Sequence, residues 1–465
     1  MQPKEFTSND RVIASAVFVA SVLFNGWNLA TPSLWRDETA TSELAHLGPH
    51  AIFVLSKTAD AVQAPYYLLM WGWTRIFGES EASLRVPSVL GVAIAVMCLY
   101  LLASRYYVSR VAAVACCVAF SALPTVVRYS QEARSYGLGL GLVMVATLIL
   151  HVALEGDSRH RWRTTYGVVL IALACVSFVS LFYMLVVHAA YAWRRVSLNR
   201  AVRVVAPAVI LGLGVGLITH RQSRQYAYIP KPRLRELVGF PSQLLGTRSL
   251  AVVFALAILV FLVQLFRDRD MSRWWWMLIL VAAPVIFWGA SQISSLYLAR
   301  YLLFCTPFFA LIAGIATSRL TRIGPALLAG GVVALGWTSQ YHVRTEVGHD
   351  DNIRAAHAAV ASHALPGDGI VLAGGRGGYA YYERRSHPAN LVDPLPYSEL
   401  PDSSKPPPAR GCAPEALRGL TRVWEIDLGS TRFATQLCGS DLKLAEHKLF
   451  GTVHVRLFIR TDSGG

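Results

Sequence analysis

Two groups of charged residues have types and spacing suited to chemistry at a membrane surface. The first is Arg36-Asp37-Glu38, which comes soon after the apolar run 12–30, with Glu43 behind it. The second is the segment 128–136, Arg-Tyr-Ser-Gln-Glu-Ala-Arg-Ser-Tyr, at the end of the apolar run 111–128. Ionisable groups at membrane depth are costly unless they face water or a partner, so such clusters mark functional sites by default.

A carboxylate and a guanidinium together can transfer a sugar from a phosphate to a hydroxyl. The carboxylate removes the proton of an acceptor hydroxyl, and Arg stabilises the departing phosphate, alone or with a divalent ion held by the second acid. The planar fork of Arg binds two phosphate oxygens at once, which Lys cannot do. The residues therefore suit cleavage of a sugar from a lipid phosphate at a membrane surface.

Two further polar sets belong to the same predicted face. Gln63-Ala64-Pro65-Tyr66-Tyr67 opens an aromatic segment, and Tyr297, Arg300 and Tyr301 precede or begin the apolar run 301–318. Each set also has a structural interpretation, because Arg300 can snorkel at a helix end and Tyr66 and Tyr67 can belong to an aromatic belt.

The charged groups have structural alternatives as well. Arg36 and Asp37 can form an ion pair that anchors a helix end, and Glu132 can pair with Arg134 as packing. The joint placement of two acids and several Arg on one face favours the functional interpretation.

The composition positions these groups in a polytopic membrane protein. Of 465 residues, 54% are hydrophobic and only 15% are charged, which is far from an ordinary soluble domain. The net charge of +15 does not indicate nucleic acid, because the basic residues form short clusters between apolar runs. Cytoplasmic loops collect Lys and Arg in this way.

Apolar runs long enough to span a bilayer, at roughly 20 residues each, fall near 12–30, 86–104, 111–128, 135–153, 204–219, 249–266, 274–291, 301–318 and 323–340. The run 165–193 is too long for one span and has basic clusters on both sides. A hairpin that breaks near Ser177 to Ser180 places both clusters in the cytoplasm.

The segment 64–77 is short and rich in Trp and Tyr, which is typical of an interfacial helix. With this segment at the interface, five basic clusters lie on one side together with the N-terminus: Arg105 and Arg110, 156–163, 194–203, 267–273 and 319–322. We therefore expect a plasma-membrane protein with a cytoplasmic N-terminus. The segments 31–85, 128–134, 220–248 and everything after about 341 would then lie outside the cytoplasm.

The predicted fold is an α-helical polytopic membrane protein with about 11 membrane segments, including the re-entrant hairpin, plus interfacial helices. Residues 1–341 would form the transmembrane domain with its outer loop 31–85. Residues 342–465 would form a small extracytoplasmic α/β domain, with strands at Gly369 to Ala373, Val423 to Leu428 and Val453 to Ile459. Cys412 and Cys438 could form a disulfide there.

Four blocks in order resemble the GT-C superfamily of membrane glycosyltransferases. They are Asp37-Glu38 and the segments 65–88 (PYYLLMWGWTRIFGESEASLRVPS), 129–138 (YSQEARSYGL) and 299–310 (ARYLLFCTPFFA). The most similar group contains protein O-mannosyltransferases, aminoarabinose transferases and the predicted membrane-bound mannosyltransferases of actinobacteria.

The resemblance implies a polyprenyl-phosphate sugar donor and inversion at the anomeric carbon. It implies Asp37 as general base and Glu132 as the acid that positions the acceptor or helps to hold a metal. Donor phosphate contacts would come from Arg134, Arg300 and Arg36. Residues lining the substrate site would be Glu38, Gln63, Tyr66, Tyr129, Gln131, Tyr136 and Tyr301.

The chain departs from the family pattern at Gln63-Ala64-Pro65, where many relatives carry His-Pro-Pro or Glu-Lys-Pro. This leaves a divalent metal, with Asp37 and Glu132 as its ligands, an open alternative.

The favoured hypothesis is a glycosyltransferase that acts on a cell-envelope glycan or lipoglycan. The donor sugar would be mannose or a pentose. The expected partners are membrane lipids, the donor and the acceptor, with no nucleic acid, and the chain would be a monomer. A transporter or flippase of lipid-linked sugars is the alternative, but transporters commonly show repeated halves, and no repeat is visible here. A sensor whose C-terminal domain binds a glycan is a third hypothesis.

Overall fold

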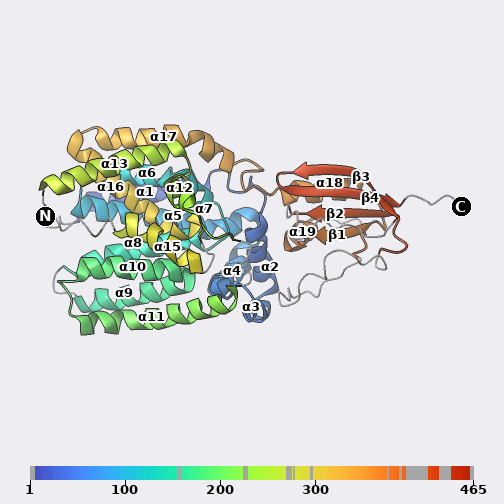
Figure 1. Ribbon diagram of the computed structural model, residues 1–465, viewed down its shortest axis with the longest axis horizontal. Helices are drawn as coiled ribbons and strands as arrows, with labels where there is room; N and C mark the ends of the chain where they lie inside the picture. The colour runs from blue at the N-terminus through green and yellow to red at the C-terminus, as the bar shows by residue number, and fades with distance from the viewer. Residues whose placement is uncertain are drawn as a thin grey trace. The chain divides into compact units, whose positions relative to one another are not determined.

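The computed structural model describes residues 6–155, 159–223, 229–268, 275, 278–293, 297–373, 376–386, 390–393, 417–428 and 441–460. The chain forms two compact units (Figure 1). The helical unit comprises Met1–Trp27 and Arg85–Tyr341, and the α/β unit comprises Asn28–Leu84 and His342–Gly465. The predicted outer loop thus shares a unit with the C-terminal segment.

Apolar helices build the helical unit. They are α1 (Ser8–Gly26), α5 (Glu81–Tyr106), α6 (Arg110–Ser121), α7 (Pro124–Ser130), α8 (Tyr136–Ala153), α9 (Arg159–Val176), α10 (Phe178–Ala192), α11 (Leu198–Arg221), α12 (Leu234–Leu245), α13 (Arg248–Asp268), the π-helical turn η4 (Leu278–Ala282), α15 (Ala283–Ile293), the 3-10 segment η5 (Ala299–Cys305), α16 (Thr306–Leu320) and α17 (Gly324–Val343).

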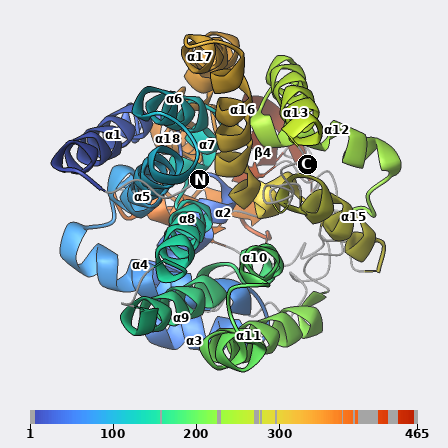
Figure 2. The ribbon, with the colours of Figure 1, turned by 90° about the vertical axis from the view of Figure 1, so that its left-hand side faces the viewer.

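Five of the described helices are long and apolar enough to cross a membrane, counting η5 and α16 as one, and the bent pair α6 and α7 makes a sixth. Buried residues make up 83% of the span formed by η5 and α16 but only 11% of the span in α11, so α11 presents its apolar side chains outward. Figure 2 looks along the bundle and shows α8 near its middle, with α11 and α17 at its edge.

The predicted break in the run 165–193 lies where α9 ends and α10 begins, with Ser177 as the residue between them. The Ser177 side chain accepts a hydrogen bond from the Ser180 N–H at 3.4 Å and so caps α10. The shorter helices α9 and α10 therefore replace one long span.

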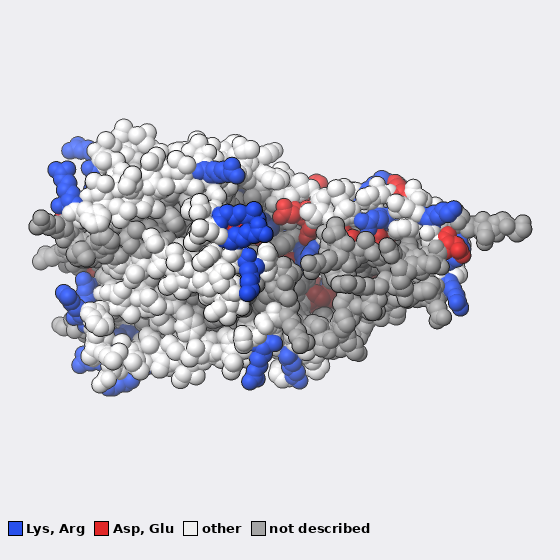
Figure 3. All heavy atoms as spheres, in the orientation of Figure 1, with Lys and Arg blue, Asp and Glu red and all other residues white. Residues whose placement is uncertain are grey.

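Lys and Arg side chains gather at the end of the helical unit that carries the N-terminus (Figure 3), and ion pairs link neighbouring helices of this unit. The Arg105 Nη2 lies 2.6 Å from Glu155 Oε2, Arg110 Nε lies 2.6 Å from Asp10 Oδ1, and Arg319 pairs with Asp268. Basic residues of two predicted clusters, Arg105 with Arg110 and 319–322, therefore form ion pairs in this unit. The orientation of the unit in a membrane stays a prediction.

Helices α5 and α8 approach each other so closely that only glycine fits. A Cβ atom on Gly91 would lie 2.4 Å from the Gly137 carbonyl oxygen, and one on Gly137 would lie 2.5 Å from the Ser88 carbonyl oxygen. Small residues allow such backbone contact between membrane helices, where apolar burial alone does not drive association.

The α/β unit holds three helices and a 3-10 turn from the first outer segment, α2 (Arg36–Leu47), α3 (Pro49–Ser56), η1 (Ala61–Gln63) and α4 (Ala64–Phe77). From the C-terminal segment it holds α18 (Ile353–His363), β1 (Gly369–Ala373), α19 (Arg376–Glu383), β2 (Arg422–Asp427), β3 (Leu442–Phe450) and β4 (Val453–Arg460). The sheet order is β1-β2-β4-β3, with β1 parallel to β2 and the other pairs antiparallel.

Three strands lie where the sequence predicts them, and β3 is a fourth that the sequence analysis missed. The helix α4 has the bounds of the predicted interfacial segment, and Leu68, Leu69, Ile76 and Phe77 on it are exposed. Cys412 and Cys438 lie outside the described residues.

We predict that Gly91→Ala destabilises the helical unit by about 1–3 kcal/mol, because the added methyl forces α5 and α8 apart. The matched control is Gly330→Ala in α17, where a Cβ meets nothing within 4 Å. Thermal unfolding of the full chain in detergent micelles compares the two. Equal midpoints for both variants would contradict the packing argument.

Candidate active site

A sharp bend between α6 and α7 positions the charged segment 128–136. The two helices meet at an angle of 67°, and Pro124 occupies the first turn of α7, where it needs no backbone hydrogen bond. The Gln340 side-chain amide donates to the Ala122 carbonyl oxygen, which the bend leaves outside helical bonding. The bend therefore starts a new, short helix that carries Arg128.

Arg128 neutralises the buried Glu132. The Arg128 Nη1 lies 3.6 Å from Glu132 Oε2, and the Glu132 side chain has no exposed surface. This ion pair joins the end of α7 to the turn that follows it. The pair between Glu132 and Arg134, the structural alternative given above, stays a prediction. A buried carboxylate without such a partner would be strongly destabilising.

Backbone-directed hydrogen bonds fix the turn that follows. The Ser88 hydroxyl donates to the carbonyl oxygens of Glu132 at 2.7 Å and Arg134 at 2.9 Å. The Gln131 side-chain amide donates to the carbonyl oxygens of Asn25 and Trp27, both at 2.8 Å. Gln131 is fully buried, so its amide ties this turn to the end of α1.

Several predicted site residues of the helical unit gather around Tyr136. The charges of Arg300, Arg134 and Glu132 all act on its phenol, as does Tyr301. The Tyr129 and Tyr136 rings meet edge to face at 5.2 Å, and the Arg300 guanidinium carbon lies 5.7 Å from the centre of the Tyr301 ring. Segments about 165 residues apart in sequence, 129–136 and 300–301, therefore form one cluster.

In the α/β unit, Glu38 holds the start of α2. It is the third residue of the helix, and its Oε2 accepts from the Trp35 N–H at 3.4 Å, as in a capping box. The same oxygen lies 3.4 Å from His349 Nδ1, and both side chains have no exposed surface. Glu38 thus joins the first outer segment to the C-terminal segment.

The two neighbours of Glu38 are more open to solvent. Arg36 is exposed, its N–H donates to Asp351 Oδ2 at 3.0 Å, and its guanidinium donates to the Leu428 carbonyl oxygen. Asp37 is partly exposed in the first turn of α2, where the helix dipole favours a carboxylate. Asp37 is therefore the more accessible acid of the pair.

Gln63 and Tyr66 lie at the start of α4. Gln63 is 9% exposed, and its Oε1 accepts no hydrogen bond from the described residues. Tyr66 and Tyr67 are each 1% exposed, and the Tyr67 hydroxyl donates to Asp60 Oδ2 at 3.0 Å. This burial argues against an aromatic belt at these two tyrosines.

One polar network escaped the sequence analysis. Arg354 pairs with Glu81 and donates to the carbonyl oxygens of Ala30 and Thr31 at 2.8 and 3.2 Å. The Tyr382 hydroxyl donates to Glu81 and accepts from the Leu34 N–H at 3.0 Å. Burial, with the Glu81 carboxylate, raises the pKa of Tyr382 above its usual range, so the phenol stays a donor.

A buried Arg344 was missed as well. It is 3% exposed, and burial lowers its pKa to about 10, so it keeps its charge at neutral pH. As for metal ligands, no group of three or more His, Cys, Asp or Glu side chains that could hold an ion occurs within the described ranges.

Comparison with known proteins gives a family match for part of the chain. Residues 64–220 match the family described as dolichyl-phosphate-mannose-protein mannosyltransferase. No protein with a curated function matches the sequence.

Solved structures match over nearly the whole chain. ArnT from Cupriavidus metallidurans in the apo state has a TM-score of 0.58 at 14% identity, covering 95% of this chain and 97% of that one. ArnT from the same organism bound to undecaprenyl phosphate has a TM-score of 0.56 at 11% identity, with 98% of each chain covered. The chain has the fold of the GT-C membrane glycosyltransferases.

A third GT-C structure is more distant. The Archaeoglobus fulgidus oligosaccharyltransferase, in a complex with Zn and sulfate, has a TM-score of 0.50 at 12% identity, covering 90% of this chain and 67% of that one. The predicted GT-C fold is therefore confirmed, as is the small C-terminal sheet. The roles of Asp37, Glu132 and the other site residues stay predictions.

We predict that Glu38→Ala lowers the free energy of unfolding by about 1–3 kcal/mol, because it removes the cap of α2 and leaves the buried His349 without this carboxylate. Asp37→Asn, one residue earlier and partly exposed, should stay within about 0.5 kcal/mol of the parent chain. Denaturant unfolding in micelles measures both. A larger loss for Asp37→Asn than for Glu38→Ala would reverse the assignment.

Proposed function

We propose that the protein is an inverting glycosyltransferase that uses a polyprenyl-phosphate sugar and acts on the extracytoplasmic face. The sugar is mannose or a pentose, and the acceptor is a cell-envelope glycan or lipoglycan. The observation that carries the proposal is the convergence of Arg134, Arg300 and Glu132 around Tyr136 in the helical unit.

The cluster is suited to a phosphate because its cations outnumber its acids. Arg128, Arg134 and Arg300 bring three positive charges to the cluster, against the one negative charge of Glu132. Two guanidiniums stabilise the charge that grows on the phosphate as the sugar leaves. ArnT, the relative with the same fold, is known bound to undecaprenyl phosphate, which supports a lipid phosphate as the leaving group here.

Asp37 is proposed as the general base. Its carboxylate takes the proton of the acceptor hydroxyl, and the acceptor oxygen attacks the anomeric carbon on the side opposite the phosphate. The bond from that carbon to the phosphate oxygen breaks, and its electron pair leaves with the polyprenyl phosphate. Glu38 has the same chemistry, but its ties to Trp35 and His349 leave it to hold the helix.

Glu132 is proposed to keep its guanidinium neighbours in place and to position the acceptor. Its burial beside Arg128 suits the first role. Arg36, next to Asp37, is proposed as a further contact for the donor phosphate, with Gln63, Tyr66, Tyr129 and Tyr301 lining the substrate. The match to a mannosyltransferase family supports mannose as the sugar to test first.

We predict that Asp37→Asn lowers kcat by about 100- to 10,000-fold, because it removes the base, while binding of the lipid donor is unchanged. Glu43→Gln is the matched control, since Glu43 lies on the same helix and pairs with Arg384 at 3.2 Å. Purified protein, a radiolabelled polyprenyl-phosphate sugar and an envelope lipid extract provide the assay.

Variants of Arg134 and Arg300 should differ from Asp37→Asn, because they change donor binding as well as turnover. Arg134→Lys and Arg300→Lys keep the charge but lose the planar fork, so both should weaken donor binding and turnover.

Full turnover by Asp37→Asn would show that Asp37 is not the base. Net movement of lipid-linked sugar across liposomes without a glycosidic product would favour the flippase alternative instead.

A further inference from the structure

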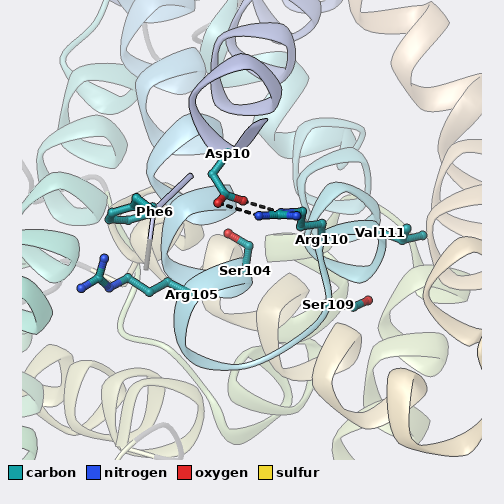
Figure 4. A pocket seen from close by; sticks show the side chains of 7 residues that line it. All are labelled: Phe6, Asp10, Ser104, Arg105, Ser109, Arg110 and Val111. Carbon is teal, nitrogen blue, oxygen red and sulfur yellow. Dashed lines mark hydrogen bonds and ion pairs between the residues drawn. The ribbon is translucent and has the colours of Figure 1, made fainter. Parts of the chain in front are cut away.

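A cavity of about 440 Å³ opens where the N-termini of α1 and α6 meet the end of α5 (Figure 4). Arg105 and Arg110 line it, together with the hydroxyls of Ser104 and Ser109. Arg110 begins α6, whereas the proposed active-site cluster follows α7, beyond the other end of that helix. The cavity is therefore separate from the cluster around Tyr136.

The one carboxylate that lines the cavity is saturated with donors. Asp10 accepts from Arg110 Nε at 2.6 Å and Nη2 at 2.9 Å, from the Thr7 N–H at 2.9 Å and hydroxyl at 2.8 Å, and from the Tyr100 hydroxyl at 3.3 Å. The negative charge of Asp10 is thus compensated by Arg110 and by hydrogen bonds within the protein. Asp10 is 5% exposed and presents little acceptor surface to the cavity.

Donors remain for an anion. The Arg105 Nη2 bonds Glu155 at 2.6 Å, and the Arg105 side chain keeps 18% of its surface exposed, so a ligand in the cavity can reach it. The Ser109 oxygen accepts from the Ala112 N–H at 3.3 Å, which leaves its own proton to donate. The N-terminus of α6 adds its dipole, which also favours an anion.

The rim of the cavity is apolar and faces outward. Val111 is 71% exposed and Phe6 is 36% exposed. The helices α1 and α6 pack against each other and carry further exposed apolar side chains. These are Val118 on α6 and Val12, Val19 and Leu23 on α1. Acyl chains would find an apolar surface there, next to donors for a phosphate.

We propose that this cavity binds a phosphate-bearing headgroup, that of a membrane phospholipid with its acyl chains along α1 and α6. The Arg105 guanidinium donates to the phosphate. The site needs no part of the proposed glycosyl transfer and stands without it.

Native mass spectrometry of the full chain, released from micelles with added phosphatidylglycerol, tests the proposal. Val111→Trp fills the mouth without touching a charge and should weaken phosphatidylglycerol binding about tenfold, or about 1.4 kcal/mol. The matched control Val118→Trp, on the same exposed side of α6, should bind as the parent chain does. Arg105→Gln should lose binding as Val111→Trp does.

Two further measurements distinguish a phospholipid from a soluble phosphate as the ligand. Phosphatidylglycerol should be retained by the parent chain, whereas glycerol 3-phosphate at the same concentration should not displace it. Equal binding by Val111→Trp and Val118→Trp would overturn the site. Displacement by glycerol 3-phosphate would overturn the lipid as its ligand and leave a soluble phosphate.

Discussion

The close crossing of α5 and α8 is the contact on which the candidate active site depends. Gly91 and Gly137 bring the two backbones together at the level of Ser88, whose hydroxyl bonds the carbonyl oxygens of Glu132 and Arg134. The charged turn is therefore held by the same crossing that packs the helices. A backbone that enters the helix packing without a neighbour to satisfy its polar groups is costly, and Ser88 and Gln131 meet that requirement here.

The three acids Glu132, Glu38 and Asp37 differ in their burial and in their partners. Glu132 is buried and forms an ion pair with Arg128. Glu38 is also buried, and its carboxylate contacts the start of α2 and His349. Asp37 keeps solvent contact. A general base must meet a substrate hydroxyl, so accessibility and not the mere presence of a carboxylate separates Asp37 from the other acids.

Local patterns in the sequence predicted much of the fold and part of the candidate active site. Apolar runs predicted most of the helices, because a membrane span needs roughly 20 consecutive apolar residues. The basic clusters on both sides of the run 165–193 predicted the break at Ser177, and the Trp and Tyr content of the segment 64–77 predicted the helix α4. The strand β3 was missed because it is an edge strand with mostly exposed residues, so its sequence does not alternate regularly between apolar and polar side chains. The cluster of Arg134, Tyr136 and Arg300 was predicted only as a shared face. The pairs of Glu81 with Arg354 and of Glu38 with His349 join residues about 270 to 310 positions apart, and no spacing in a single sequence reveals such contacts.

The position of a bound lipid phosphate tests the proposed donor site most directly. An electron cryo-microscopy structure of the full chain in nanodiscs, with an excess of polyprenyl phosphate, would show it. We predict a phosphate oxygen within hydrogen-bond distance, about 3 Å, of the guanidinium of Arg134 or Arg300. A phosphate held by other residues, with both of these guanidiniums out of reach, would contradict it.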